Sequence, residues 1–392
     1  MQGELFEPPT MLLREAVLGR NGVVPLIVIG CGRKKRQEAA PADQLYTSDR
    51  FKSCINLVRS LGAPYAILSG KHGIVAGEMV IAPYDLNLPD LPEANQRDWA
   101  EQVLDALAAR AESRQVTLLA ANEYSMPLLE LNRARASPLD IVAPWLGLEY
   151  SDHAIWLAEA KRMAARIQDL DRLYNWIGEE RIADRVFSFR ELSSRSVPKR
   201  GVYIFLDGAE RNFRGAGFRV VRIGTHAVSA GSQASLRGRL RNHLGPSSQI
   251  GNHRGSIFRL HIGRAMLEAG PGHGSLATWG EGQDARPEVK SLEIAHELAV
   301  SRYLQDLEVV LLEVDDEPSK ESLRAKVEMQ LIALFSESMR TIDCPGPDWL
   351  GLKSPVAQIR QSGLWNIRGI GGKYDPAAAG SVASIFRGLN NG

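Results

Sequence analysis

Three neighbouring segments decide the fold of the second half of the chain: GVYIFLD (201–207), FRVVRIGTH (218–226) and SLRGRLRNH (235–243). The first two are rich in β-branched and aromatic residues, so they predict two strands, and their spacing predicts a hairpin with a long glycine-containing loop. The third segment has leucines four residues apart and predicts a helix. The second half therefore opens with a hairpin followed by a basic helix.

The predicted helix carries three arginines and a histidine. Leu236 and Leu240 set its buried stripe, and Arg239 and His243 border that stripe at a spacing of four residues. A basic helix is ordinarily a solvated surface, and this remains the alternative interpretation. Because a solvated helix would place its cations away from the apolar stripe, the positions of Arg239 and His243 favour a phosphate-handling site.

The composition is that of an ordinary globular protein, with 44% hydrophobic and 24% charged residues in a chain of 392. No apolar run is long enough for a membrane span, and the amino-terminal segment lacks the features of a signal peptide. The three cysteines, Cys31, Cys54 and Cys344, are widely spaced, which argues against disulfides and a zinc site. We therefore expect a cytoplasmic protein without membrane contact.

The charge is unevenly distributed, although the net charge is only +1. Residues 187–264 hold 14 Lys and Arg against 3 Asp and Glu, whereas residues 265–335 hold 6 against 14. A basic block of this kind is typical of nucleic-acid-binding proteins. Pairing of the two blocks with each other would give the same pattern, and the sequence leaves both interpretations open.

The first half alternates between predicted strands and helices. Strand-like apolar runs lie at 23–32, 64–75 and 115–124, and helices are predicted at 49–62 and 97–113. This alternation predicts a parallel sheet covered on both faces, a Rossmann-like α/β arrangement. Since ligands bind where parallel strands end, we expect a site in the loops after Ile29, Leu68 and Leu119.

The chain length predicts two domains. Residues 1–150 form the predicted α/β domain, 151–186 a helical connector, and 187–392 the second domain. Within the second domain, further helices are predicted at 290–306 and 319–336, and the glycine-rich segment 267–287 is predicted to be a loop.

The second half resembles the GIY-YIG endonuclease superfamily over about residues 186–370. GVYIF (201–205) and VVRIGT (220–225) are similar to its two strand motifs, and the helix that follows carries an Arg and a nearby His at Arg239 and His243. The resemblance implies an α+β domain with a small antiparallel sheet flanked by helices. It also implies hydrolysis of DNA phosphodiester bonds.

Two later elements of the family are also present. Glu328, before the apolar QLI of VEMQLIALF (327–335), resembles the family's helical Glu, and Asn366 in SGLWNIRGI (362–370) resembles its late Asn. The resemblance makes Glu328 a ligand of Mg²⁺ or Mn²⁺, which are hard cations that prefer oxygen ligands. Asn366 would hold the geometry of the site.

The resemblance assigns catalytic roles to Tyr203, Arg222, Arg239, His243 and Glu328. Arg239 would clamp the phosphate oxygens, on which charge gathers in the transition state. Tyr203 would orient or deprotonate the attacking water, and His243 would shuttle a proton near neutral pH.

Arg222 is a departure, because the second motif of the family ordinarily begins with Tyr. A cation there would lower the pKa of a neighbouring phenol or grip a phosphate instead, so the identity of the general base stays open. Glu293 and Glu297, which share a helix face, are rivals of Glu328 as the metal ligand.

Four arginines are predicted to hold the DNA backbone: Arg237, Arg241, Arg254 and Arg259. The last two lie in GNHRGSIFRLHIG (251–263), which is predicted to be strand or loop. His253 and His261 of the same segment are expected to have no catalytic role.

The first half carries CGRKK (31–35), SGKHG (69–73) and APYDL (82–86) at predicted strand ends. It resembles an uncharacterised Rossmann-like bacterial domain, and its Cys-x₃-Lys segment is remotely similar to one in archaeosine synthase, which handles 7-deazaguanine in tRNA. The resemblance implies a pocket for a purine-like base or nucleotide. The candidate ligand-binding residues are Cys31, Lys35, Ser69, Lys71, His72, Tyr84 and Asp85.

The leading hypothesis is a metal-dependent DNA endonuclease that acts in defence against foreign, modified or phage DNA, with a first domain that recognises a base or nucleotide. One alternative places a base-modifying or N-glycosidic enzyme in the first domain and leaves only DNA binding to the second. A non-catalytic nucleic-acid-binding module is the other. A one-metal site cuts one strand at a time, so cutting both strands would require a homodimer or two binding events.

Overall fold

The computed structural model describes residues 9–245, 250–270, 276–282, 284–319, 321–339 and 341–389. The chain divides into two compact units, Met1–Gln168 and Asp169–Gly392. Helix α6 (Asp152–Ile182) is continuous over 31 residues and contains the boundary between the units. Among the described residues, no helix has both the length and the apolar character that crossing a membrane requires.

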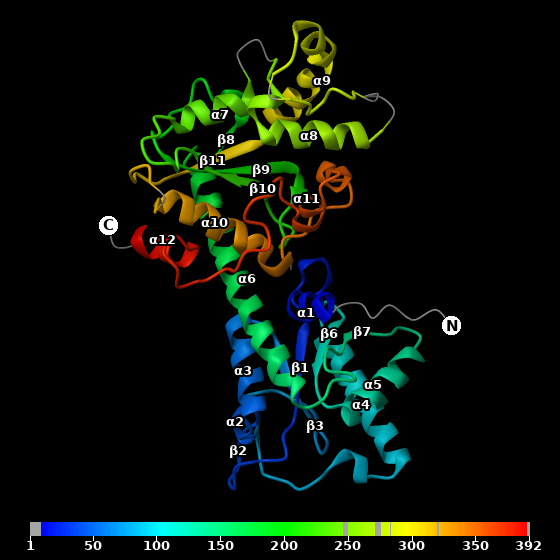
Figure 1. Ribbon diagram of the computed structural model, residues 1–392. Helices are drawn as coiled ribbons and strands as arrows, with labels where there is room; N and C mark the ends of the chain where they lie inside the picture. Colours follow the sequence, from blue (N-terminus) through cyan, green and yellow to red (C-terminus); the bar gives the residue numbers. More distant parts are fainter. Residues whose placement is uncertain are drawn as a thin grey trace. The chain divides into compact units, whose positions relative to one another are not determined.

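A five-stranded sheet with the order β4-β3-β1-β6-β7 forms the centre of the first unit (Figure 1). Its strands are β1 (Leu26–Gly30), β3 (Tyr65–Ser69), β4 (Gly73–Val75), β6 (Gln115–Leu119) and β7 (Asp140–Val142). All pairings are parallel except that of β4, which runs antiparallel to β3. The sheet is therefore mixed, not wholly parallel as predicted, because the predicted run 64–75 turns back on itself at Gly70–Gly73.

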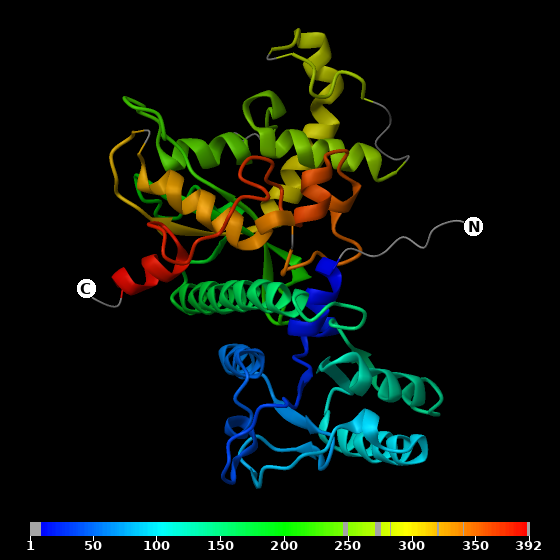
Figure 2. The ribbon, with the colours of Figure 1, turned by 60° about the horizontal axis from the view of Figure 1, so that its bottom comes forward.

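Helices cover both faces of this sheet. The helices are α1 (Pro9–Leu18), α2 (Ala42–Leu45), α3 (Asp49–Leu61), α4 (Glu93–Arg110) and α5 (Asn122–Arg133), and a separate two-stranded sheet pairs β2 (Ala40–Pro41) with β5 (Val80–Ile81). Val28 of β1 packs in one cluster with Trp99 and Leu104 of α4. Helix α3 lies on the other side of β1 from α4 and α5, as Figure 2 shows. Buried strands alternate their side chains between the two covered faces.

The second unit is built on an antiparallel sheet with the order β10-β9-β11-β8. Its strands are β8 (Phe187–Ser188), β9 (Gly201–Arg211), β10 (Phe218–Gly224) and β11 (Glu308–Glu313). The antiparallel pairing of β9 with β10 confirms the predicted hairpin. Strand β11, which was not predicted from the sequence, lies between β9 and β8.

Helices also pack on both sides of this second sheet. They are α7 (Leu236–Leu244), α8 (Ile257–Glu268), α9 (Pro287–Asp306), α10 (Leu323–Ser336), α11 (Ala357–Ser362) and α12 (Val382–Leu389). Helices α7 and α8 lie on one side of the sheet and α10 on the other (Figure 1). Leu236 and Leu240 of α7 are fully buried against Phe205 of β9, which confirms the predicted stripe of the basic helix.

Helix α8 replaces the strand or loop predicted for residues 251–263. Apolar and basic residues alternate in SIFRLHIG, which imitates a strand. In the structure, the Ser256 hydroxyl caps the helix by accepting a hydrogen bond from the Arg259 N–H at 3.3 Å. Phe258, Ile262 and Ala265 then share the buried face of the helix at spacings of four and three residues.

Candidate active site

A chain of hydrogen bonds links β9, α7 and the start of α8. Tyr203 Oη lies 2.9 Å from His243 Nε2, and His243 Nδ1 lies 2.7 Å from Ser256 Oγ. Tyr203 is 1% exposed and His243 is fully buried. A neutral imidazole has one donor and one acceptor nitrogen, so His243 connects the phenol to the Ser256 hydroxyl in either tautomer.

The imidazole of His243 is neutral at neutral pH. Burial lowers the pKa of His243 well below its ordinary value, and the positive charges of Arg222, Arg239 and Arg259 lower this pKa further. The role predicted for His243, shuttling a proton, stays a prediction; with this low pKa, the ring would hold an added proton only briefly.

Gly224, at the end of β10, lies directly opposite Tyr203 in the hairpin. A Cβ atom at this position would lie 2.1 Å from Tyr203 Oη, far closer than any real contact. The glycine therefore leaves the space that the phenol occupies, and this is the physical reason for a glycine at the end of VVRIGT.

Two half-buried groups of opposite charge, Arg239 on α7 and Glu328 on α10, interact electrostatically. Burial raises the pKa of Glu328, although Arg222, a hydrogen bond from the Thr225 backbone and Arg239 oppose the rise. The charge of Arg239 also lowers the pKa of His243. Arg239 is therefore within electrostatic reach of both groups.

Arg222, where the chain departs from the resembled motif, is anchored in the interior. Its Nη1 donates a hydrogen bond to the Trp365 carbonyl at 2.6 Å, and its guanidinium carbon lies 4.6 Å from the centre of the Phe258 ring. Only 8% of the residue is exposed. These contacts do not fit the predicted grip on a phosphate; instead, the charge of Arg222 lowers the pKa of His243 and opposes the rise of that of Glu328.

Asn366 seals the outer edge of the sheet at β10. Its Oδ1 accepts a hydrogen bond from the Ile223 N–H at 3.1 Å, and its Nδ2 donates one to the Ile223 carbonyl at 2.8 Å. The Trp365 N–H donates to the Val221 carbonyl at 2.7 Å. These bonds take the place of a neighbouring strand and fix the backbone between Arg222 and Gly224.

Replacing Asn366 with Ala is expected to lower the free energy of unfolding of the second unit by about 1–3 kcal/mol, because two buried backbone groups lose their partners. Thermal unfolding measures this loss. Gln361→Ala, at an exposed position of α11, is the matched control and should leave stability within about 0.5 kcal/mol of the wild type. Equal unfolding temperatures for Asn366→Ala and Gln361→Ala would show that the hydrogen bonds of Asn366 to β10 contribute nothing to stability.

The comparison with protein families covers both units. A GIY-YIG domain model matches residues 164–391. The chain belongs to the GIY-YIG family. A family of unknown function (DUF6884) matches residues 26–159, and no curated protein and no solved structure matches the chain. Membership of the GIY-YIG family indicates a nuclease that acts on DNA, and nucleases of this family generally depend on divalent metal ions.

The two rivals of Glu328 within the GIY-YIG domain are held in buried ion pairs. Arg254 donates to both oxygens of Glu293, at 2.6 and 2.9 Å, and Arg259 donates to Glu297 Oε2 at 2.6 and 3.0 Å. The Glu297 carboxylate also accepts from the His253 N–H at 2.6 Å. With their oxygens occupied in this way, Glu293 and Glu297 do not fit the role of metal ligand.

The same ion pairs overturn two predicted DNA contacts. The side chains of Arg254 and Arg259 are 3% and 0% exposed, so they do not reach a DNA backbone as predicted. Arg237 is also anchored, through hydrogen bonds to the carbonyls of Leu192 and Arg195 at 3.0 and 2.5 Å. Of the four arginines predicted to hold DNA, only Arg241 is exposed.

Pairing between the basic and acidic blocks of the GIY-YIG domain accounts for part of the uneven charge. Besides the pairs of Arg254 and Arg259, Arg200 pairs with Glu317 at 2.7 Å, and Arg190 pairs with Asp306. Much of the basic block is therefore neutralised within the fold. Arg239 makes no such pair among the residues that the structure describes, and Arg241 makes none either.

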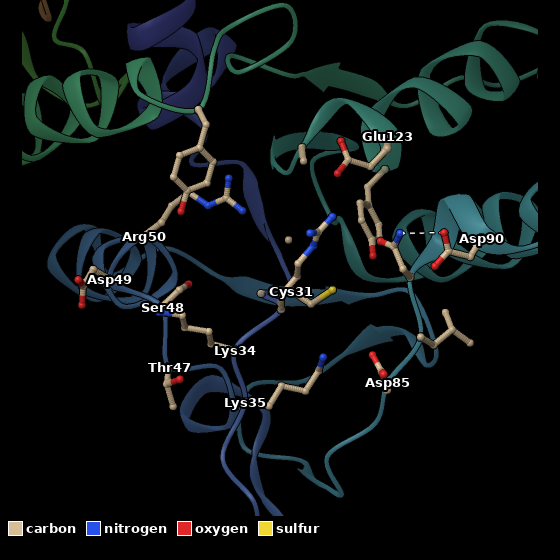
Figure 3. A pocket seen from close by; sticks show the side chains of 18 residues that line it. Cys31, Lys34, Lys35, Thr47, Ser48, Asp49, Arg50, Asp85, Asp90 and Glu123 are labelled. Carbon is tan, nitrogen blue, oxygen red and sulfur yellow. Dashed lines mark hydrogen bonds between the residues drawn. The ribbon is translucent and has the colours of Figure 1, made fainter.

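A separate cleft of about 990 Å³ lies in the first unit, where β1 and β6 end (Figure 3). Three predicted ligand-binding residues, Cys31, Lys35 and Asp85, line it, and this place matches the predicted loops after Ile29 and Leu119. Other residues that line the cleft and were not predicted from the sequence to bind a ligand include Arg33, Lys34, Arg50, Asp90, Glu123 and Tyr150. The run of four cations at 33–36 was the available signal for two of them.

Four other predicted ligand-binding residues do not line this cleft: Ser69, Lys71, His72 and Tyr84. The buried Ser69 hydroxyl lies 2.7 Å from Tyr84 Oη and accepts hydrogen bonds from the N–H groups of Lys71 and His72. It therefore closes the turn between β3 and β4. The prediction of a ligand contact for Ser69 is wrong, because its hydrogen-bonding capacity is used within the fold.

Proposed function

We propose that the GIY-YIG domain of this protein is a metal-dependent endonuclease that hydrolyses DNA phosphodiester bonds. The observation that carries the proposal is the buried Tyr203–His243–Ser256 chain, together with the half-buried Arg239, whose charge acts on both His243 and Glu328. This arrangement combines a group that accepts a proton, a cation for the phosphate and a carboxylate for a metal ion. Those are the three requirements of phosphodiester hydrolysis by water.

Arg239 is the group that we assign to the scissile phosphate. It has no ion-pair partner among the described residues, unlike Arg254 and Arg259, so its fork of donors is available for phosphate oxygens. It is also half-buried, and a charge interaction is stronger there than on an open surface. Negative charge that develops on the phosphate oxygens in the transition state would be stabilised at this position.

The residues present fit a divalent cation that stays largely hydrated. No group of three or more His, Cys, Asp or Glu side chains that would enclose a metal ion occurs in the described part of the chain. Mg²⁺ keeps several waters and is held by one or two carboxylates together with substrate phosphates, so the single carboxylate of Glu328 suffices. Mg²⁺ or Mn²⁺ at Glu328 would supply charge for the phosphate and for the leaving 3′ oxygen.

Tyr203 and His243 are assigned to the attacking water. The water oxygen forms a bond to phosphorus while the bond from phosphorus to the 3′ oxygen breaks. The water proton passes to Tyr203 Oη while the phenol proton passes to His243 Nε2, whose other ring nitrogen is held by Ser256 Oγ. The leaving oxygen takes a proton from solvent, and His243 and Tyr203 return theirs to solvent, so that both side chains end the cycle unchanged. Because the pKa of His243 is low, the imidazole gives this proton up readily.

Tyr203→Phe is expected to lower the cleavage rate about 10²-fold, because it removes the first proton acceptor and keeps the packing of the ring. A plasmid-nicking assay with Mg²⁺ measures the rate. Tyr303→Phe is the matched control. It removes a hydroxyl from the same unit, but this hydroxyl donates to Asp207 and makes no hydrogen bond to His243. Equal rates for the Tyr203→Phe protein and the wild type would remove Tyr203 from the chemistry.

The proposal extends to the biological role. The first unit would recognise a base or nucleotide in its charged cleft and would direct or gate the nuclease, in defence against foreign or modified DNA. Cleavage of unmodified and modified phage DNA, each with Mg²⁺, with Mn²⁺ and with a chelator, tests both parts. Absence of cleavage under all metal conditions would contradict the proposed nuclease activity. Equal cleavage of all DNA types would contradict the proposed selective role of the first unit.

A further inference from the structure

The cleft of the first unit carries opposite charges that are not paired. Four cations line it, Arg33, Lys34, Lys35 and Arg50, and so do four carboxylates, Asp49, Asp85, Asp90 and Glu123. None of these eight groups forms an ion pair with any residue that the structure describes. In Figure 3, Lys34 and Arg50 lie on one side of the cleft and Asp90 and Glu123 on the other, with Cys31 between them.

The cationic wall combines a loop with the start of a helix. The Thr47 N–H donates to the Lys34 carbonyl at 3.0 Å, which holds the loop after β1 against the segment that leads into α3. Ser48 caps this 13-residue helix, and its first turn lines the cleft. The carboxylate of Asp49 lies in the same turn, so this wall holds two cations, Lys34 and Arg50, and one anion. The partial positive charge of the helix N-terminus adds to the two cations, and together they favour an anion such as phosphate.

The acidic wall offers acceptors. At neutral pH, the carboxylates of Asp90 and Glu123 accept hydrogen bonds and donate none. Asn87 Nδ2 donates to Asp90 Oδ1 at 3.2 Å and steadies that carboxylate. Tyr124, next to Glu123, is buried, and its ring packs edge-on against Trp99. A ligand on this side must therefore present N–H or O–H donors.

An aromatic side chain lies at the same cleft. Tyr150 is 66% exposed, and the Arg50 guanidinium carbon lies 4.6 Å from the centre of its ring. The exposed Tyr150 ring offers a flat surface on which a planar base stacks, and the guanidinium of Arg50 stays available for the phosphate. The cleft volume of about 990 Å³ is ample for a nucleotide and far larger than an inorganic anion needs.

These features select one class of ligand: an anion at one end and a planar base with adjacent donors at the other. Guanine presents N1–H and the N2 amino group side by side, which matches the two oxygens of one carboxylate. Adenine, cytosine and thymine each place an acceptor next to their donor, and an acceptor would face a carboxylate unfavourably. The acidic wall therefore discriminates between bases.

We propose that this cleft binds a guanine nucleotide, with its phosphate at Lys34, Arg50 and the start of α3, and its base edge at Asp90 and Glu123. The inference rests on the proposed role of the first unit as a reader of a base or nucleotide. Free nucleotide and a nucleotide within a single strand share this chemistry, so both are tested.

Isothermal titration of the full chain, in the Glu328→Gln form and with a chelator present, tests the proposal. Guanosine 5′-monophosphate is expected to bind about tenfold more tightly than adenosine 5′-monophosphate, a difference typical of one well-formed pair of hydrogen bonds. Short single-stranded DNA with and without one guanine forms the second arm. Binding of the guanine strand alone would support the same chemistry and assign the ligand to a polynucleotide.

Three variants locate the ligand. Lys34→Ala should weaken binding of both mononucleotides by about tenfold, because a phosphate contact is lost. Lys52→Ala removes one charge from an exposed position of α3 outside the cleft and should change neither affinity by more than about twofold. Glu123→Gln should reduce the preference for guanine and leave adenosine monophosphate binding unchanged. Equal affinity for the two mononucleotides, or equal effects of Lys34→Ala and Lys52→Ala, would overturn the proposal.

A cleavage assay on the wild-type protein keeps the two proposals apart. If the protein binds the guanine nucleotide but cuts no DNA, only the proposed nuclease activity is contradicted. If it cuts DNA but binds neither the mononucleotides nor the guanine strand, only the proposed nucleotide site is contradicted.

Discussion

Glu328→Gln and Arg239→Ala are each expected to lower the rate of DNA cleavage about 10³-fold while the protein stays folded. Gln keeps the size of Glu328 but loses the negative charge that a hard cation requires. Ala at position 239 removes the guanidinium that would stabilise developing charge on the phosphate. Neither side chain is fully buried or holds an ion pair among the described residues, so both changes should leave stability nearly unaltered.

Arg241→Ala is the matched control for this prediction. It removes one arginine from the same helix, but from an exposed position. We expect its rate to fall by no more than about threefold at physiological salt, because an exposed phosphate contact is screened. Circular dichroism and thermal unfolding verify that all three variants are folded. If Arg239→Ala cuts DNA as well as Arg241→Ala does, Arg239 does not act on the scissile phosphate.

Arg259→Leu is expected to destabilise the second unit by about 3–5 kcal/mol, because it leaves Glu297 buried without its cation. Arg259 donates to Glu297, to Ser301 Oγ at 2.8 Å and to the His243 carbonyl at 2.9 Å. A loss of this size should lower the unfolding temperature by about 6–20 °C. Arg264→Leu, on a half-buried position of the same helix, should change it far less.

The pH dependence of stability provides a second readout. Burial alone would raise the pKa of Glu297, but hydrogen bonds from His253 and the charge of Arg259 outweigh it, and the pKa lies below its ordinary value of 4.5. Such a carboxyl stabilises the fold above its unfolded pKa, and this contribution is lost as the pH falls through the folded pKa. The stability difference between wild type and Arg259→Leu should therefore narrow in acid. A constant difference would show that Glu297 is not the group left unpaired.

The sequence revealed the parts of the second unit that depend on local pattern. The hairpin of β9 and β10 follows from β-branched and aromatic residues, and the buried stripe of α7 follows from leucine spacing. The buried ion pairs of Arg254 and Arg259 do not follow from local pattern, because their partners, Glu293 and Glu297, lie 39 and 38 residues away. A basic residue that pairs in the interior and one that faces DNA look alike until the fold brings distant charges together.

The same distinction applies to the first unit. Strand ends predicted the location of the cleft and the contribution of Cys31 and Lys35. Ser69 sits at another strand end, yet it is used to close a turn, since β4 turns back along β3. Arg50 and Glu123 belong to the first turns of α3 and α5, and their convergence on one cleft follows from the sheet order, which the sequence does not state.

The hydrogen bonds that Trp365 and Asn366 make to β10 also determine when the site of the proposed nuclease is completed during synthesis. The partner of Arg222 and the partner of Ile223 are each 143 residues further along the chain. A ribosome must therefore add Trp365 and Asn366 before the strand that carries Gly224 is secured. Chains that stop earlier would hold both strand motifs and the basic helix without the hydrogen bonds that fix β10 beside the proposed site.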